Sequence, residues 1–224
     1  MEDLDVIATR NIKEQRERVE FLFSKFKKRA EPRYAVKKYV ISFGMFLAEY
    51  VLRIKTDSID ANADNILLDC RRLCEIFIVS KYMNKNNNFH EFTDYCDYDR
   101  YDYLENLKKM TEANKKMFPE IKDLFFSPTF LTDEQSKITK RRGNKGKKIP
   151  SILEMAKNIG YEEEYNSFYK ITSKLLHFCP FSFNGDMLLE TRDKRFNYFK
   201  RIEMYLTEIK KELDLIYEKT KLEN

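Results

Sequence analysis

The sequence contains no tryptophan, and it is poor in the two residues that interrupt regular structure, with five glycines and five prolines among 224 residues. Alternating runs of β-branched residues, which are typical of strands, are almost absent as well. Lysine, glutamate, leucine, isoleucine, tyrosine and phenylalanine dominate instead, and this composition favours helices. We therefore predict an all-α fold, a single-domain helical bundle over residues 1–224 with about five to seven helices and a loop excursion near 119–149.

Several familiar catalytic motifs are missing. The chain has no phosphate-binding glycine loop, no Cys-x-x-Cys pair and no Gly-x-Ser-x-Gly elbow. It has only two histidines, His90 and His177, so a zinc site would have to bring one of them to cysteines on other helices. We therefore expect neither a bound metal nor a cofactor.

The four cysteines are too few for a disulfide scaffold. Cys70 and Cys74 stand one helical turn apart, a spacing that suits packing in a helical core. No apolar run approaches the roughly 18 residues of a membrane span, and the first residues lack the basic and apolar segments of a signal peptide. We expect reduced thiols in a soluble cytoplasmic protein with no membrane partner.

The formal net charge is +5, which permits a nucleic-acid partner without requiring one. Lysine and arginine gather between residues 137 and 148, where there are two glycines and no acidic residue. This segment is either a mobile, solvated loop or a contact for the phosphate backbone of a nucleic acid. Under the second interpretation the candidate nucleic-acid-binding residues are Lys140, Arg141, Arg142, Lys145, Lys147 and Lys148.

The spacing of apolar residues predicts where the helices lie. The expected ranges are 4–29, 33–55, 58–83, 90–118, 152–158, 165–177 and 186–221. Asp57 or Ser58 is expected to cap the third of these helices. Ser151 is expected to cap the fifth, with Glu154 completing a capping box and Gly160 ending the helix.

One predicted helix carries an unusual row of polar side chains. Tyr165, Tyr169, Ser173 and His177 follow each other at four-residue steps, so they form a stripe along one side of the helix. A hydroxyl, two phenols and an imidazole in a row require polar partners or solvent if this side turns toward other helices.

A second predicted helix, 58–83, places Arg71 and Glu75 on an otherwise apolar face. Two interpretations are open. In one, the polar residues form an internal network that fixes how the helices pack, with Glu75 neutralising Arg71. In the other they form a catalytic site, in which Arg71 binds a phosphate or carboxylate, Glu75 orients Arg71, and His177 exchanges a proton near neutral pH. Tyr169 and Ser173 would then position the substrate.

Two segments resemble a known family. The first is Leu-Leu-Asp-Cys-Arg-Arg-Leu-Cys-Glu at 67–75, and the second is the short helix at 152–160 followed by Tyr165, Tyr169, Ser173 and His177. They are similar to the Arg-x-x-x-Glu helix and the Tyr-x-x-x-Ser-x-x-x-His helix of an uncharacterised bacterial family, domain-of-unknown-function family 5677. The resemblance covers roughly residues 35–185 and implies a helical bundle without a settled activity.

This family is in turn loosely similar to helical defence and toxin proteins, among them the HEPN ribonucleases, which use Arg-x4–6-His at a dimer interface to cut RNA without a metal. No arginine stands at that spacing before His177. The arginine would have to come from another helix, for which Arg71 is the best candidate, or from a partner subunit.

Our leading hypothesis is an RNA-directed defence or stress-response protein that acts as a metal-independent endoribonuclease. RNA, a second copy of the chain or a regulatory protein would be its partners. The alternative is a non-catalytic helical binding or regulatory module, whose polar cluster is structural or binds a small anionic ligand.

Overall fold

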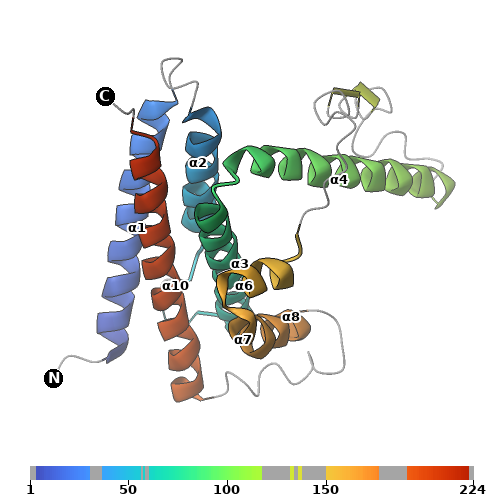
Figure 1. Cartoon of the computed structure of the whole chain (residues 1–224). Coiled ribbons are helices and arrows are strands. Elements are labelled where there is room, and N and C mark those ends of the chain that lie inside the picture. Colours follow the sequence, from blue (N-terminus) through green and yellow to red (C-terminus); the bar gives the residue numbers. More distant parts are fainter. Residues whose placement is uncertain are drawn as a thin grey trace. The chain divides into compact units, whose positions relative to one another are not determined.

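A computed structural model describes residues 4–30, 37–56, 58, 61–117, 132–133, 136–137, 150–176 and 191–221. Every regular element in this part of the chain is helical, which confirms the all-α prediction (Figure 1). The elements are α1 (Leu4–Arg29), α2 (Lys38–Leu52), α3 (Ala63–Asn86), α4 (Phe89–Met117), α6 (Ile152–Ile159), α7 (Glu162–Glu164), the π-helical η2 (Tyr165–Tyr169), α8 (Lys170–Leu176) and α10 (Arg192–Lys219).

The chain divides into two compact units. The first comprises Met1–Phe89 and Pro150–Asn224, and the second comprises His90–Ile149. Most of α4 lies in the second unit, where Leu104 is buried against Tyr101 and Leu107. The single domain over 1–224, the loop excursion near 119–149 and the basic loop at 137–148 stay predictions, because most of 118–149 lies outside the described residues.

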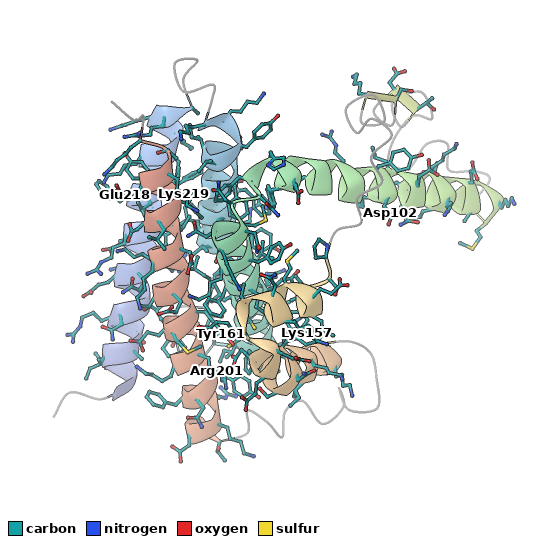
Figure 2. All side chains as sticks on the ribbon, viewed as in Figure 1. Asp102, Lys157, Tyr161, Arg201, Glu218 and Lys219 are labelled. Atoms are coloured by element: carbon teal, nitrogen blue, oxygen red, sulfur yellow. The ribbon has the colours of Figure 1, made fainter. Side chains whose placement is uncertain are left out.

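The core of the first unit lies between α1, α2, α3 and α10. Helices α1 and α10 lie side by side and run in the same direction (Figure 1), and their side chains meet between the ribbons (Figure 2). Two hydrogen bonds hold α1 against α10. Asn11 donates to Glu203 at 2.7 Å, and the Arg29 guanidinium donates to the Tyr217 hydroxyl at 3.2 Å. Helix α10 turns an apolar stripe into this core. Tyr217 of the stripe is half-buried, and these residues are fully buried: Ile202, Tyr205, Leu206, Ile209, Leu213 and Ile216.

The predicted start of the third helix was wrong. Neither Asp57 nor Ser58 caps it, because α3 begins at Ala63 and its cap is Asn62, whose side chain accepts the N–H of Asp64 at 2.8 Å. The difference comes from a tertiary contact that precedes the helix.

Buried Asp69, on α3, holds the segment that leaves α2. Its Oδ2 accepts the backbone N–H groups of Lys55 at 3.1 Å and Thr56 at 3.0 Å, and the Thr56 hydroxyl at 2.7 Å. These bonds satisfy backbone donors outside a helix and hold Lys55 and Thr56 in a non-helical segment, and α3 begins only at Ala63.

The ends of the other central helices follow their local signals. Ser151 and Glu154 form the predicted capping box of α6, and Gly160 ends it in the left-handed region at φ 80°. Helix α3 continues to Asn86, three residues beyond the prediction, and ends at Asn87 in the same region at φ 53°. Asparagine is one of the few residues with a side chain that adopts this conformation readily.

Helices α1 and α2 approach closely at Gly44. A Cβ atom added there would lie 2.4 Å from the ring of Phe26, which is fully buried. That ring in turn packs edge-on against Tyr217, with 5.5 Å between ring centroids. The ring therefore has little freedom to move away.

We predict that Gly44→Ala lowers the free energy of unfolding by about 1–3 kcal/mol, although alanine in a helix interior ordinarily stabilises relative to glycine. Urea denaturation of the full chain measures the change. In a Phe26→Leu background the same substitution should cost less, because leucine leaves room for the new methyl group. An equal cost in both backgrounds would contradict the close contact.

Candidate functional site

The helix that carries the predicted polar stripe contains a π-helical turn. Helices α7, η2 and α8 follow each other without a break, and the N–H of Lys170 donates to the carbonyl of Tyr165, five residues earlier. The turn buries Phe168 and Thr172, and the Thr172 hydroxyl donates to the carbonyls of Phe168 at 3.0 Å and Tyr169 at 3.1 Å. π-helical turns are rare in proteins as a whole, and those that occur frequently lie at functional sites.

Three of the predicted site residues lie together, although they come from two helices. Arg71, on α3, donates from Nη2 to the Tyr169 hydroxyl at 3.2 Å. That hydroxyl donates in turn to Oε2 of Glu75 at 3.5 Å. The guanidinium carbon of Arg71 lies 5.2 Å from the centroid of the Tyr169 ring, and Tyr165 stacks on Tyr169 at 5.0 Å. We call Arg71, Glu75 and Tyr169 the arginine cluster.

The donors of Arg71 are only partly used. Its Nε is buried and has no hydrogen-bond partner among the described residues. The Glu75 carboxylate, its ion-pair partner among the described residues, is 4.0 Å away. A guanidinium has five N–H donors, and a paired carboxylate would ordinarily accept two of them at a shorter distance. The side chain of Arg71 is 24% exposed, so an anion from solvent can reach the exposed part of the guanidinium, although Nε itself is buried.

Tyr169 supports Arg71 as a protonated phenol. Burial, together with the negative charge of Glu75, raises the pKa of Tyr169, while Arg71 acts in the opposite direction. The hydroxyl therefore keeps its proton near neutral pH, where it can donate and accept hydrogen bonds but does not act as a base.

The other predicted site residues are less closely placed or lie outside the described residues. Ser173 is half-buried on α8, one turn after Tyr169, and its hydroxyl joins no hydrogen bond among the described residues. Helix α8 is described up to Leu176, so His177 lies just outside the described residues, as do the six basic candidates between 140 and 148. The roles of all these residues stay predictions.

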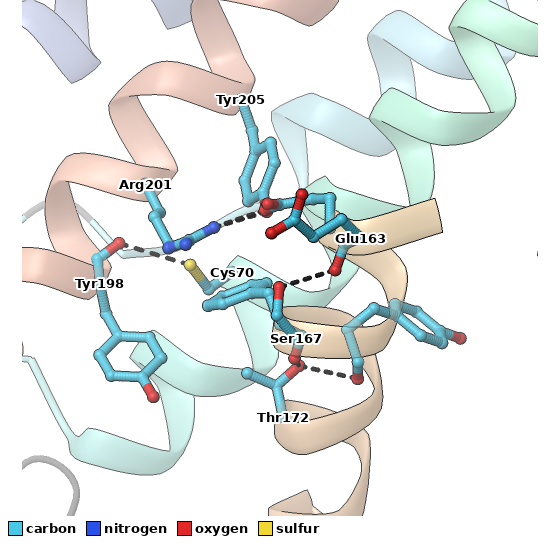
Figure 3. A network of polar contacts seen from close by, with 10 residues as sticks. Cys70, Glu163, Ser167, Thr172, Tyr198, Arg201 and Tyr205 are labelled. Atoms are coloured by element: carbon cyan, nitrogen blue, oxygen red, sulfur yellow. Dashed lines mark hydrogen bonds and ion pairs between the residues drawn. The ribbon is translucent and has the colours of Figure 1, made fainter. Parts of the chain in front are cut away.

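A second polar cluster was not predicted, and it joins the same helix to α10 (Figure 3). The Tyr205 hydroxyl donates to the carboxylate of Glu164, and Arg201 donates to the same oxygen at 2.5 Å. The guanidinium of Arg201 lies 4.3 Å from the centroid of the Phe168 ring. Arg201 precedes Tyr205 by one helical turn, and this placing beside an apolar stripe was the available sequence signal. We call Glu164, Arg201 and Tyr205 the buried cluster after the fully buried Tyr205, although Glu164 and Arg201 are only half-buried.

Two thiols adjoin the buried cluster. Cys70 and Cys74 are free and buried, which confirms their predicted place in the core. The thiol of Cys70 lies 3.4 Å from the carbonyl of Tyr198 (Figure 3). Burial raises the pKa of Cys74 to about 12 and also raises that of Cys70, so both thiols stay protonated and unreactive at neutral pH.

Two searches of the described residues bear on other functions. No helix among them is long and apolar enough to cross a lipid bilayer. Within the same residues, no three side chains of histidine, cysteine, aspartate or glutamate gather closely enough to hold a metal ion.

One family model matches the chain, over residues 60–196, and its description is a family of unknown function, DUF5677. The matched span includes all of α3 and α8, and therefore every member of the arginine cluster. It begins and ends later than the predicted 35–185. No curated protein and no solved structure matches the chain. The looser similarity to HEPN ribonucleases stays a prediction.

A matched pair of substitutions separates the two clusters. We predict that Tyr205→Phe lowers the free energy of unfolding by about 1–3 kcal/mol, because it removes the hydrogen bond that the hydroxyl of fully buried Tyr205 donates to Glu164. Tyr169→Phe should cost less than about 1 kcal/mol, because Tyr169 is only half-buried and its bonds to Arg71 at 3.2 Å and Glu75 at 3.5 Å are long. Urea denaturation of both variants tests this order. Equal losses would mean that the arginine cluster is as structural as the buried one.

We also predict a loss of stability at high pH that depends on Cys74. The raised pKa of Cys74 adds to the free energy of unfolding, and this stabilisation is fully present below about pH 9. As the pH rises toward 12, the stabilisation is lost at up to about 1.4 kcal/mol per pH unit. Between pH 9 and 11 the unfolding free energy of Cys74→Ala should therefore decline less steeply than that of the wild type. Cys96→Ala, at an exposed position, is the control and should keep the wild-type slope. The same slope in both variants would contradict the prediction.

Proposed function

Because this chain belongs to the family of unknown function DUF5677, whose description assigns no activity, we propose a function from its own residues: an RNA-directed protein of cellular defence or stress response that acts as a metal-independent endoribonuclease. The observation that carries this proposal is the state of Arg71. It is a half-buried cation with unused donors, held by Tyr169 and only loosely paired with Glu75.

A phosphate diester is a good partner for such an arginine. Guanidinium and phosphate form two parallel hydrogen bonds, which are stronger than a single contact to a carboxylate at 4.0 Å. Glu75 is 41% exposed, so it can turn toward solvent when a phosphate arrives. Tyr169 keeps Arg71 in place through its hydroxyl and ring, which lowers the entropy lost when the phosphate binds.

The proposed reaction needs one group that takes up and returns a proton. His177 is the general base that accepts the proton of a ribose 2′-hydroxyl. The 2′-oxygen attacks phosphorus, the bond to the 5′-oxygen breaks, and a proton goes to that leaving oxygen. The products are a 2′,3′-cyclic phosphate and a 5′-hydroxyl. Arg71 stabilises the charge that develops on the phosphate oxygens, and Ser173 positions the scissile group.

The wider parts of the proposal concern partners and location. The basic residues between 140 and 148 bind the RNA backbone, which makes affinity dependent on salt. In line with the loose similarity to HEPN ribonucleases, a second copy of the chain or a regulatory protein is the proposed partner. The proposed location is the cytoplasm.

One observation favours a second candidate, a non-catalytic module that binds a small anionic ligand. Tyr169 makes the hydrogen bond to Arg71 and holds its own proton near neutral pH, since burial raises its pKa. The arginine cluster can therefore bind an anion without transferring a proton. Catalysis depends on His177 in addition, whereas anion binding does not.

The test compares cleavage of total cellular RNA, in EDTA, by the wild type, His177→Ala and Arg71→Gln. We predict cyclic-phosphate ends from the wild type, a loss of about 10²–10⁴-fold in rate for His177→Ala and about 10²–10³-fold for Arg71→Gln. The matched control is Arg53→Gln, which breaks another arginine–glutamate pair four residues apart, with Glu49 at 2.7 Å on α2. It should stay within about twofold of the wild type.

Circular dichroism and urea denaturation establish that each variant is folded. A wild type without cleavage, a cleavage that EDTA abolishes, or rates that neither variant changes would reject the ribonuclease. If RNA or phosphate binds without cleavage, and Arg71→Gln but not Arg53→Gln weakens that binding, the second candidate is supported instead.

A further inference from the structure

An open groove of about 580 Å³ lies between the last turns of α3, the end of α6 and the last turns of α10. Figure 2 labels three of its lining residues, Tyr161, Glu218 and Lys219. Its volume falls in the range of small-molecule sites. None of its lining residues belongs to the arginine cluster or the buried cluster, so the groove is a separate feature.

The two carboxylates of the groove are already neutralised. Glu212 is buried, and Lys81 donates to its Oε1 at 3.1 Å. Burial opposes the charge of Lys81, but the hydrogen bond and charge of Glu212 outweigh it and raise the pKa of Lys81. Glu218 is neutralised as well, because it forms an ion pair with Lys221.

Two lysines of the groove have no such partner among the described residues. Lys219 donates to the carbonyl of Asn84 at 2.9 Å, and Lys85 donates to the carbonyl of Asn158. A carbonyl satisfies a donor but does not neutralise the charge. Burial lowers the pKa of Lys219, and the charge of Glu212 only partly opposes this effect. The groove therefore has two lysines that no described carboxylate neutralises directly, and one of them is partly desolvated.

The groove also has a buried acceptor without a donor. Within the part of the chain that the structure describes, the Oδ1 atom of Asn84 has no hydrogen-bond partner. Its orientation is fixed, because Nδ2 of the same amide donates to Oε2 of Glu212 at 2.7 Å, and a rotated amide would bring two acceptors together. An unpaired buried acceptor is unfavourable, and a ligand whose N–H or O–H group reaches it would remove that cost.

Apolar surface completes the groove. Ile159 and Tyr161 follow from the end of α6, and Leu215 on α10 is 54% exposed, which is high for a large aliphatic side chain. Tyr161 is held by the ring of Phe77, which meets it edge-on at 5.0 Å. A flat ligand can lie against this fixed ring.

We propose that this groove binds a small organic anion whose flat body donates a hydrogen bond, the chemistry of a purine nucleoside monophosphate. The phosphate meets Lys85 and Lys219, an exocyclic amine donates to Oδ1 of Asn84, and the ring covers Tyr161 and Leu215. This inference does not depend on the proposed ribonuclease, because it uses other residues. The competing explanation is that both lysines only stabilise the ends of α3 and α6, where helix carbonyls carry partial negative charge.

Isothermal titration of the full chain with adenosine monophosphate tests the proposal. Adenosine, ribose 5-phosphate and inorganic phosphate are titrated in parallel. We expect the monophosphate to bind at least about tenfold more tightly than any of the three fragments, since each lacks the anion, the amine or the flat ring. Fragments that bind as tightly as the monophosphate, or no binding by any probe at millimolar concentration, would overturn the proposal.

Two variants assign the binding to the groove. Lys219→Met should weaken binding about tenfold or more, because it removes a charge-assisted hydrogen bond. Leu215→Glu, at an exposed position, should weaken it through repulsion without disturbing the core. The control is Lys200→Met, which removes an exposed lysine from the same helix far from the groove and should leave affinity within about twofold. Unchanged affinity in Lys219→Met and Leu215→Glu would overturn the assignment, and Leu215→Glu decides it alone if Lys219→Met fails to fold.

Discussion

The structure of the first unit depends on the buried phenol of Tyr205, which α10 places in the core. Most of the apolar stripe of α10 is fully buried among α1, α2 and α3, and Tyr205 belongs to that stripe. A buried hydroxyl must find a hydrogen-bond partner. Glu164 supplies it, and Arg201 neutralises that carboxylate. This bond ties α7 to α10, and because η2 and α8 continue from α7, it also helps to place Tyr169 beside Arg71 on α3.

The degree to which charges are satisfied distinguishes the polar sites of the first unit. In the buried cluster, Glu164 accepts hydrogen bonds from both Arg201 and Tyr205. Within the described residues, Arg71 has a looser ion pair and one buried N–H without a partner, and two lysines of the groove have no carboxylate partner. Saturated networks rigidify a fold, whereas partly satisfied cations gain free energy from an incoming anion. This contrast is the physical basis for assigning the buried cluster to stability and for proposing that the arginine cluster and the groove bind anions.

Much of the fold could be predicted because helices are determined mainly by local sequence. Apolar spacing located the helices, and the capping box at Ser151 with Gly160 located both ends of α6. The start of α3 was missed because Asp69 captures the backbone of Lys55 and Thr56, a contact across 13 and 14 residues that no local pattern reveals. Likewise, Glu164 stands in a run of three glutamates that is typical of a solvated surface, and only the packing of α7 near α10 pairs it with Tyr205 and Arg201.

By itself, the sequence determined the helical class and the polar character of the two helices that carry Arg71 and Tyr169, since both follow from residue type and spacing. Tertiary structure decided which of these side chains meet. The segment Tyr165–Tyr169 forms a π-turn, and the Tyr169 hydroxyl lies 3.2 Å from Nη2 of Arg71. Nε of Arg71 has no hydrogen-bond partner among the described residues. Contacts such as the one between Tyr169 and Arg71 join residues almost a hundred positions apart, and their distances depend on how whole helices pack.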